Sequence, residues 1–111
     1  MKNKYRAIPT TVDGIKFASK REAARYSELK LLERAGAIRG LAVHPSWPMA
    51  VNGKKIGRYT ADFMYAERLS DGEYSDVIIE DVKSKASKTE AYGLRKKLML
   101  AIYGIEIKEI F

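Results

Sequence analysis

Two segments with helix start and stop signals enclose a long stretch with strand patterns. The first opens at Ser19, with Glu22 placed as the partner in a capping box, and stops at Gly36. The second opens at Thr89 and stops at Gly104. Between and after these segments the hydrophobic pattern changes to the period of strands. This order predicts an α/β (α+β) domain in which helices flank a central mixed sheet.

The strand patterns divide into short runs separated by turn signals. We expect strands at residues 41–43, 47–51, 56–65, 74–83 and 105–108, and a short one at 15–17. Asn52-Gly53 and Asp71-Gly72 are typical of turns. The rest of residues 1–18 is expected to form a basic arm. Residues 1–111 are expected to form a single domain.

Side chains of the second helix and of the strands provide the expected core. The helix is expected to turn inward Tyr92, Leu94, Leu98, Met99, Ala101 and Ile102. The strand aromatics Trp47, Tyr59, Phe63 and Tyr65 are also expected in the core, not as platforms for stacked bases.

Missing residue types exclude several chemistries. The chain has no cysteine, so disulfides, thiolate metal sites and a cysteine nucleophile are excluded. Its one histidine, His44, excludes zinc sites built on two or three histidines. We expect His44, beside Pro45, to be structural or to contact phosphate. Carboxylates and lysines must therefore carry any catalysis.

The charge balance favours a polyanionic partner. Twenty-one Lys and Arg residues against fourteen Asp and Glu give a net charge of +7. A phosphate-binding groove is expected to be lined by Arg21, Arg25, Lys85, Lys88, Arg95 and Lys96. No signal peptide is recognised, and the longest apolar run is far short of the roughly 20 residues that span a bilayer. We therefore expect a cytoplasmic protein.

Charged residues end the apolar strand predicted at 74–83. Side chains alternate along a strand, so Asp81 and Lys83 share one face while Glu80 and Val82 share the other. Buried charges without a partner are costly. The simplest structural explanation is an edge-strand Asp81–Lys83 ion pair, worth under about 1 kcal/mol.

Asp62 suggests an alternative explanation, because it stands among aromatic residues in the preceding predicted strand. If the two strands are antiparallel neighbours, Asp62 and Asp81 come together. Two carboxylates about 4 Å apart repel by about 4 kcal/mol at an effective dielectric near 20. A cation such as Mg²⁺, which accepts hard oxygen ligands, removes that penalty. Lys83 would then position or deprotonate a water, or stabilise charge on a phosphoryl oxygen.

Asp62 together with Asp81-Val82-Lys83 resembles the signature of the PD-(D/E)xK nuclease superfamily, although Ala61 stands where the family pattern has proline. Residues 13–23, 59–65, 79–85 and 96–105 extend the likeness over nearly the whole chain. They are similar to a family of short phage and prophage proteins assigned to that superfamily. The resemblance implies a restriction-endonuclease-like α-β-β-β-α-β core, dependence on Mg²⁺ or Mn²⁺, and DNA cleavage.

The resemblance also implies an acidic residue on the first helix. Glu22 is the preferred candidate, because it shares a helix face with Tyr26 and Leu29; Glu28 lies roughly 120° away around the helix. Asp62 and Asp81 would then be metal ligands, with Glu22 acting directly or through water. Glu80 is left as either a supporting acid or a surface residue.

The expected substrate is DNA, branched or duplex. We expect no separate recognition domain in a chain this short, so selection by DNA shape is favoured, as in the superfamily's Holliday junction resolvases. These work as homodimers in which two sites cut opposing strands. The expected setting is a bacterial host cell, with the protein encoded by a phage or prophage. Alternatives are a non-enzymatic basic DNA-binding protein and, less favoured, an RNA-directed nuclease or ribosome-associated factor.

Overall fold

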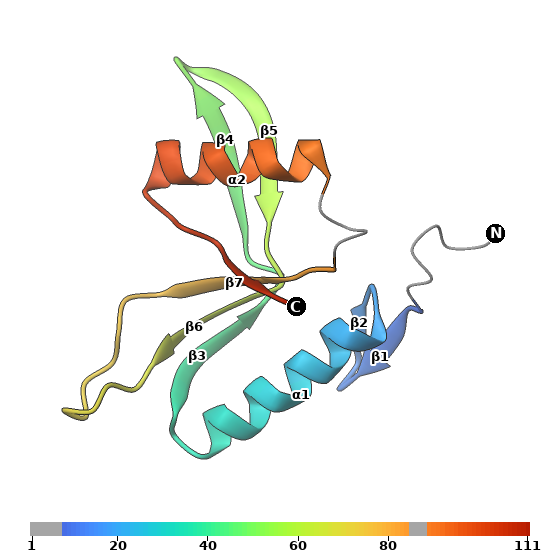
Figure 1. The fold of residues 1–111 in the computed structure, drawn as a ribbon, viewed down its shortest axis with the longest axis vertical. Helices are drawn as coiled ribbons and strands as arrows, with labels where there is room; N and C mark the ends of the chain where they lie inside the picture. The colour runs from blue at the N-terminus through green and yellow to red at the C-terminus, as the bar shows by residue number, and fades with distance from the viewer. Residues whose placement is uncertain (1–7, 85–88) are drawn as a thin grey trace.

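The computed structural model describes residues 8–84 and 89–111 and contains two helices, a sheet and two hairpins (Figure 1). In chain order the elements are β1 (Thr10–Val12), β2 (Ile15–Phe17), α1 (Lys20–Arg34), β3 (Ile38–Val43), β4 (Ser46–Val51), β5 (Lys54–Thr60), β6 (Phe63–Glu67), β7 (Ile78–Val82), α2 (Glu90–Tyr103) and β8 (Lys108–Ile110). The sheet has the order β3-β6-β7-β8, and β1–β2 and β4–β5 form the hairpins. Only β7 and β8 pair in parallel, so the sheet is mixed, as predicted.

The two faces of the sheet are covered by different elements. On one face, α1 and the β1–β2 hairpin form a core of Phe17, Ala23, Tyr26, Leu29, Ile38, Phe63 and Tyr65. On the other, α2 and the β4–β5 hairpin form a core of Met49, Tyr59, Ala61, Ile79, Tyr92, Met99 and Ile107. Alternation along β7 separates the two, since Ile78 packs against the first core and Ile79 belongs to the second.

The predicted helix ends are confirmed. Ser19 Oγ accepts a hydrogen bond from the Glu22 amide at 3.1 Å, and Thr89 Oγ1 accepts one from the Tyr92 amide at 3.1 Å. Gly104 caps α2 in the left-handed region, at φ 68°. These short-range signals place the N-terminal turn of each helix, which matters because Glu22 lies in the first turn of α1.

Four strand predictions were wrong in their bounds, and one strand was not predicted. The strand expected at 56–65 is two strands, β5 and β6, interrupted at residues 61–62. The expected arm contains a further strand, β1, paired with β2. β3 starts at Ile38, before the expected 41–43, and β7 starts at Ile78, after the expected residue 74. β8 overlaps the strand expected at 105–108 only at Lys108.

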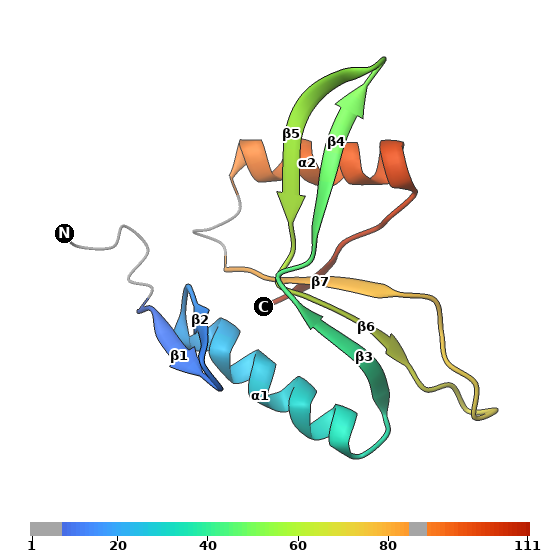
Figure 2. The same cartoon turned by 180° about the vertical axis from the view of Figure 1, so that it is seen from behind.

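The inward face predicted for α2 was too wide. Tyr92 and Met99 are buried and Leu98 and Ile102 are partly buried, but Leu94 is 60% exposed and Ala101 is exposed. Because α2 lies across the two-stranded β4–β5 hairpin (Figure 2), its partner surface is narrow and covers one stripe of the helix. Within the described residues, neither helix has the length and apolar character needed to cross a membrane.

Candidate metal centre

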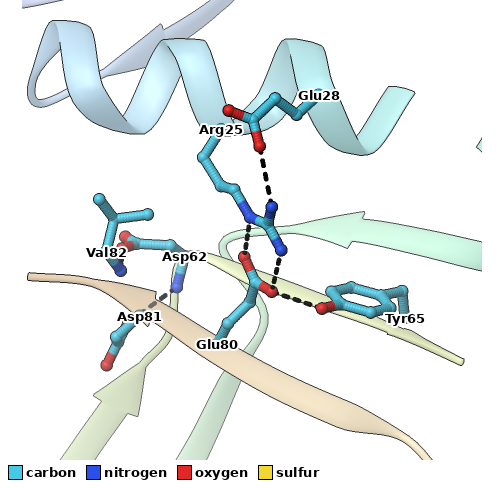
Figure 3. A network of polar contacts seen from close by, with 7 residues as sticks. All are labelled: Arg25, Glu28, Asp62, Tyr65, Glu80, Asp81 and Val82. Carbon is cyan, nitrogen blue, oxygen red and sulfur yellow. Dashed lines mark hydrogen bonds and ion pairs between the residues drawn. The ribbon is translucent and has the colours of Figure 1, made fainter. Parts of the chain in front are cut away.

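Asp62 lies between the end of β5 and the start of β6, and hydrogen bonds fix it to β7 and to the loop after β3. Its amide donates to Asp81 Oδ1 at 3.0 Å, and its carbonyl accepts from the His44 amide at 2.9 Å. Its side-chain Oδ2 accepts from the Val82 amide at 2.7 Å. Since β6 and β7 are antiparallel neighbours, as predicted, they bring Asp62 and Asp81 together (Figure 3).

Three potential ligand groups gather at this junction. Glu22 from α1, His44 from the loop between β3 and β4, and Asp62 each present a ligand atom within 4.8 Å of the others. His44 Nε2 lies 2.8 Å from Glu22 Oε1. Glu22 is buried, Asp62 is partly buried and His44 is exposed, so the cluster opens to solvent on the histidine side.

Helix geometry decides between the two acids of α1. Glu22 lies on the buried face with Tyr26 and Leu29 and is 6% exposed. Glu28 has a side chain that is 64% exposed and contacts Arg25 on the same helix. Glu22 is therefore the acid of α1 that joins the cluster, in agreement with the sequence-based preference.

The cluster concentrates negative charge where solvation is poor. Burial raises the pKa of Asp62 from its ordinary value of 3.8 to about 6, and the nearby Glu22 carboxylate adds to the effect. Two full charges 4.8 Å apart repel by roughly 3 kcal/mol at an effective dielectric near 20. A cation bound between them would relieve this repulsion.

Asp81 has a different set of contacts. It is buried on the α2 face of the sheet, where its Oδ2 accepts a hydrogen bond from the Tyr59 hydroxyl while Oδ1 accepts from the Asp62 amide. Burial raises its pKa, and the positive charge of Lys83 acts in the opposite direction. Among the described residues, Asp62 clusters with Glu22 and His44, and Asp81 adjoins this cluster through the Asp62 amide.

Lys83 follows β7 and lies on the same face as Asp81, as the alternation predicts. Its Nζ lies 4.1 Å from the centroid of the Tyr92 ring, a cation–π contact that holds the ammonium group against α2. β7 has neighbours on both sides, so the edge-strand ion pair considered from the sequence does not describe it.

A family model described as a protein of unknown function, DUF1064, matches residues 2–109. The chain belongs to this family. No curated protein and no solved structure matches the chain. The family description of this DUF1064 protein names no activity.

In this DUF1064 member Glu80 is neither exposed nor part of the cluster. Its side chain is 0% exposed. Oε1 accepts a hydrogen bond from Arg25 Nε at 2.7 Å, and Oε2 accepts one from Arg25 Nη2 at 2.8 Å (Figure 3). The Tyr65 hydroxyl donates to the same Oε2. The surface alternative for Glu80 was wrong. Arg25, expected to contact phosphate, is committed to this ion pair, because an unpaired buried carboxylate would be costly.

The other basic residues of the DUF1064 chain that were expected to line a phosphate-binding groove differ in exposure and in their partners. Arg21 and Arg95 are exposed, and Arg21 Nη1 donates to the Lys83 carbonyl at 3.3 Å. Lys96 Nζ pairs with Glu109 at 3.1 Å. Lys85 and Lys88 lie outside the described residues.

His44 is the member of the cluster that sequence reasoning missed. Its backbone adopts φ 54°, an uncommon conformation for a residue other than glycine. Such conformations persist where the surrounding structure enforces them, often at functional sites. In the sequence, the available signal was a lone histidine ahead of a proline, between two predicted strands.

Proposed function

We propose that this protein is a divalent-metal-dependent endonuclease that hydrolyses DNA phosphodiester bonds. The observation that carries the proposal is the clustering of Glu22, His44 and Asp62 next to Asp81 and Lys83. The element order α1, β3, β6, β7, α2, β8 supports it, because it follows the α-β-β-β-α-β order of the restriction-endonuclease-like core. The β4–β5 hairpin is then an insertion between the first two sheet strands.

The donor set fits Mg²⁺ or Mn²⁺. Asp62 and Glu22 offer the hard carboxylate oxygens that both ions accept, and the His44 imidazole suits Mn²⁺ better than Mg²⁺. Asp81 would complete the set from the neighbouring strand, directly or through a water. A bound ion would polarise a phosphoryl oxygen and lower the pKa of a coordinated water.

The other groups at the junction would position the reactants. Asp81 holds the Asp62 backbone through its amide, which fixes the direction of the Asp62 carboxylate. The Lys83 ammonium group, anchored over Tyr92, would orient the attacking water or stabilise the negative charge that grows on the phosphate. Arg25 and Glu80 would act at a distance, by holding α1 against β7.

The substrate proposed is branched or duplex DNA, recognised by shape. The net charge of +7 favours a phosphate backbone as partner, and phosphate contacts carry no base sequence by themselves. Junction resolution by a homodimer is the specific form of the proposal, since two opposing cuts require two sites. The proposed setting is the cytoplasm of a bacterial host, with a phage or prophage as the source.

The test is cleavage of duplex, flap and four-way-junction DNA in Mg²⁺, Mn²⁺ or EDTA. We expect cleavage with either ion and none in EDTA. Asp81→Asn should lose cleavage and keep DNA binding, whereas Asp76→Asn, a change at an exposed loop residue, should match the wild type. Equal nicking by wild type and Asp81→Asn would reject the site. DNA binding with no cleavage in either metal would leave the non-enzymatic DNA-binding alternative.

A further inference from the structure

The β4–β5 hairpin projects from the body of the molecule, and both of its ends lie at the candidate metal centre (Figure 1, Figure 2). β4 begins two residues after His44, and β5 ends two residues before Asp62. The Ala61 amide donates to the Pro45 carbonyl at 3.0 Å, which closes the base of the hairpin. A ligand lying along the hairpin would therefore be led toward the Glu22, His44 and Asp62 cluster.

The two faces of the hairpin differ. The inner face packs Met49 and Tyr59 into the core under α2, with Trp47 against them. The outer face exposes Ser46, Pro48, Arg58 and Thr60, which stand opposite one another as the pairs Ser46↔Thr60 and Pro48↔Arg58.

Polar groups follow one another along the outer face. Arg58 Nε donates to Ser46 Oγ at 3.0 Å, and Thr60 Oγ1 donates to the same oxygen at 3.2 Å. A guanidinium group and two hydroxyls thus form a row that ends beside the metal centre. Arg, Ser and Thr side chains supply many of the phosphate contacts in protein–DNA complexes.

All charged residues of the hairpin are positive, and all lie on β5. Residues 44–61 contain no aspartate or glutamate, while Lys54, Lys55 and Arg58 are all exposed. The two lysines lie next to the tip, where Asn52 and Gly53 form the turn with φ values of 51° and 75°. Positive charge therefore extends from the tip of the hairpin to Arg58, two residues before the end of β5.

We propose that the outer face of the β4–β5 hairpin is a track for the phosphate backbone of duplex DNA, leading the backbone to the Glu22, His44 and Asp62 cluster. The proposal rests on the proposed function for its direction, since it takes this cluster as the site of cleavage. A two-stranded ribbon is narrow enough to lie along a DNA groove and contact the phosphates at its edge. The hairpin then supplies substrate contacts that the basic residues of α1 and α2 do not.

The test compares two double variants that each remove two positive charges. Lys55→Ala with Arg58→Ala changes the track, because Arg58 lies on the outer face and Lys55 pairs with Ala50, next but one to Pro48 on that face. Arg34→Ala with Arg68→Ala changes exposed residues at the opposite end, since Arg34 lies about 18 Å along α1 from Glu22. Binding of each variant to a short DNA duplex is measured in EDTA, where no cleavage occurs, over about 0.05 to 0.2 M salt.

The track variant is expected to lower the slope of log K against log salt by about 2 and to weaken binding about 30-fold at 0.15 M salt. The control variant should keep the wild-type slope. Thermal unfolding of both variants should match the wild type, because the substituted side chains are exposed.

Equal losses in both double variants would overturn the track in favour of charge spread over the whole surface, and an unchanged slope in the track variant would overturn it outright. If the track variant loses more affinity for double-stranded RNA than for double-stranded DNA, the choice of DNA as the ligand is overturned. If the slope of log K against log salt falls in the track variant but the wild type cleaves DNA in neither Mg²⁺ nor Mn²⁺, the track is supported and the nuclease function is rejected. The two failures are therefore distinguishable.

Discussion

Arg25 on α1 and Glu80 on β7 form a two-point ion pair across the interface of helix and sheet. The Nε–Oε1 distance is 2.7 Å and the Nη2–Oε2 distance is 2.8 Å, and the Glu80 carboxylate is fully buried. The Tyr65 hydroxyl donates to the same carboxylate, and burial together with Glu80 raises the pKa of Tyr65. The pair joins the helix that carries Glu22 to the strand that carries Asp81, so it fixes how these two acids lie relative to one another.

Removal of Arg25 should destabilise the fold strongly. In Arg25→Met the Glu80 carboxylate stays buried without its cation, and we expect the free energy of unfolding to fall by about 3–5 kcal/mol. Glu28→Gln, which removes the exposed partner of Arg25, should cost under about 1 kcal/mol. Urea unfolding measures both. The double variant Arg25→Met with Glu80→Leu should recover much of the loss; a loss in Arg25→Met no larger than in Glu28→Gln would contradict the role of the pair.

Asp62 should make the stability of the metal-free protein depend on pH. Its pKa is about 6 in the folded protein against an ordinary value of 3.8, so the folded state binds this proton more tightly than the unfolded state. The contribution of Asp62 to the free energy of unfolding is fully present below about pH 4 and is lost as the pH rises through about 6. Its size is on the order of 3 kcal/mol. Urea unfolding in EDTA from about pH 4 to about pH 7 should show this decline. Asp62→Asn should make the decline clearly smaller, leaving the part due to Asp81, whose pKa burial also raises, and Asp76→Asn should retain the full decline. The same slope in Asp62→Asn and wild type would show that another group is responsible.

Mn²⁺ should stabilise the protein through Glu22 and not through Glu28. An ion present at about 100 times its dissociation constant raises the free energy of unfolding by about 2.7 kcal/mol, provided that it binds only the folded state. We expect Glu28→Gln to keep this gain and Glu22→Gln to lose most of it, because Glu22 alone of the two lies in the cluster. Thermal unfolding with and without Mn²⁺ measures the gain. Equal stabilisation of both variants would place the ion elsewhere.

Lys83 should affect cleavage and not metal affinity. Its ammonium group contacts Tyr92 and is not among the clustered ligands, so Lys83→Ala should slow cleavage by about 10²–10⁴-fold. Lys97→Ala, which changes an exposed lysine on α2, is the control for lost charge. Single-turnover cleavage and Mn²⁺ titration are compared for both variants. A fall in Mn²⁺ affinity in Lys83→Ala would show that its role is to hold the metal site together.

Short-range signals account for what was predictable in this fold. Ser19 and Thr89 fix where the helices begin, because a capping side chain acts on amides three residues away. Asn52-Gly53 fixes a hairpin for a similar reason, since its turn requires positive φ at both positions. Strand alternation alone predicts that the neighbouring acids Glu80 and Asp81 lie on opposite faces of the sheet, without any information on tertiary contacts.

Long-range contacts account for the errors. The break at Asp62 depends on bonds to Asp81, Val82 and His44, which no pattern within residues 56–65 contains. Glu80 is buried because Arg25, fifty-five positions earlier, reaches it from another element. His44 reaches Glu22 only once α1 and the loop after β3 are packed together.

Mn²⁺ anomalous scattering from a crystal of this protein tests the central claim, a metal centre at the junction of α1, β3, β6 and β7, most directly. We expect one strong peak within ligand distance of the Glu22 and Asp62 carboxylates, with the His44 imidazole or the Asp81 carboxylate beside it. A peak bound at some other surface, with these two carboxylates making no contact to the ion, would contradict the claim and leave a positively charged DNA-binding protein.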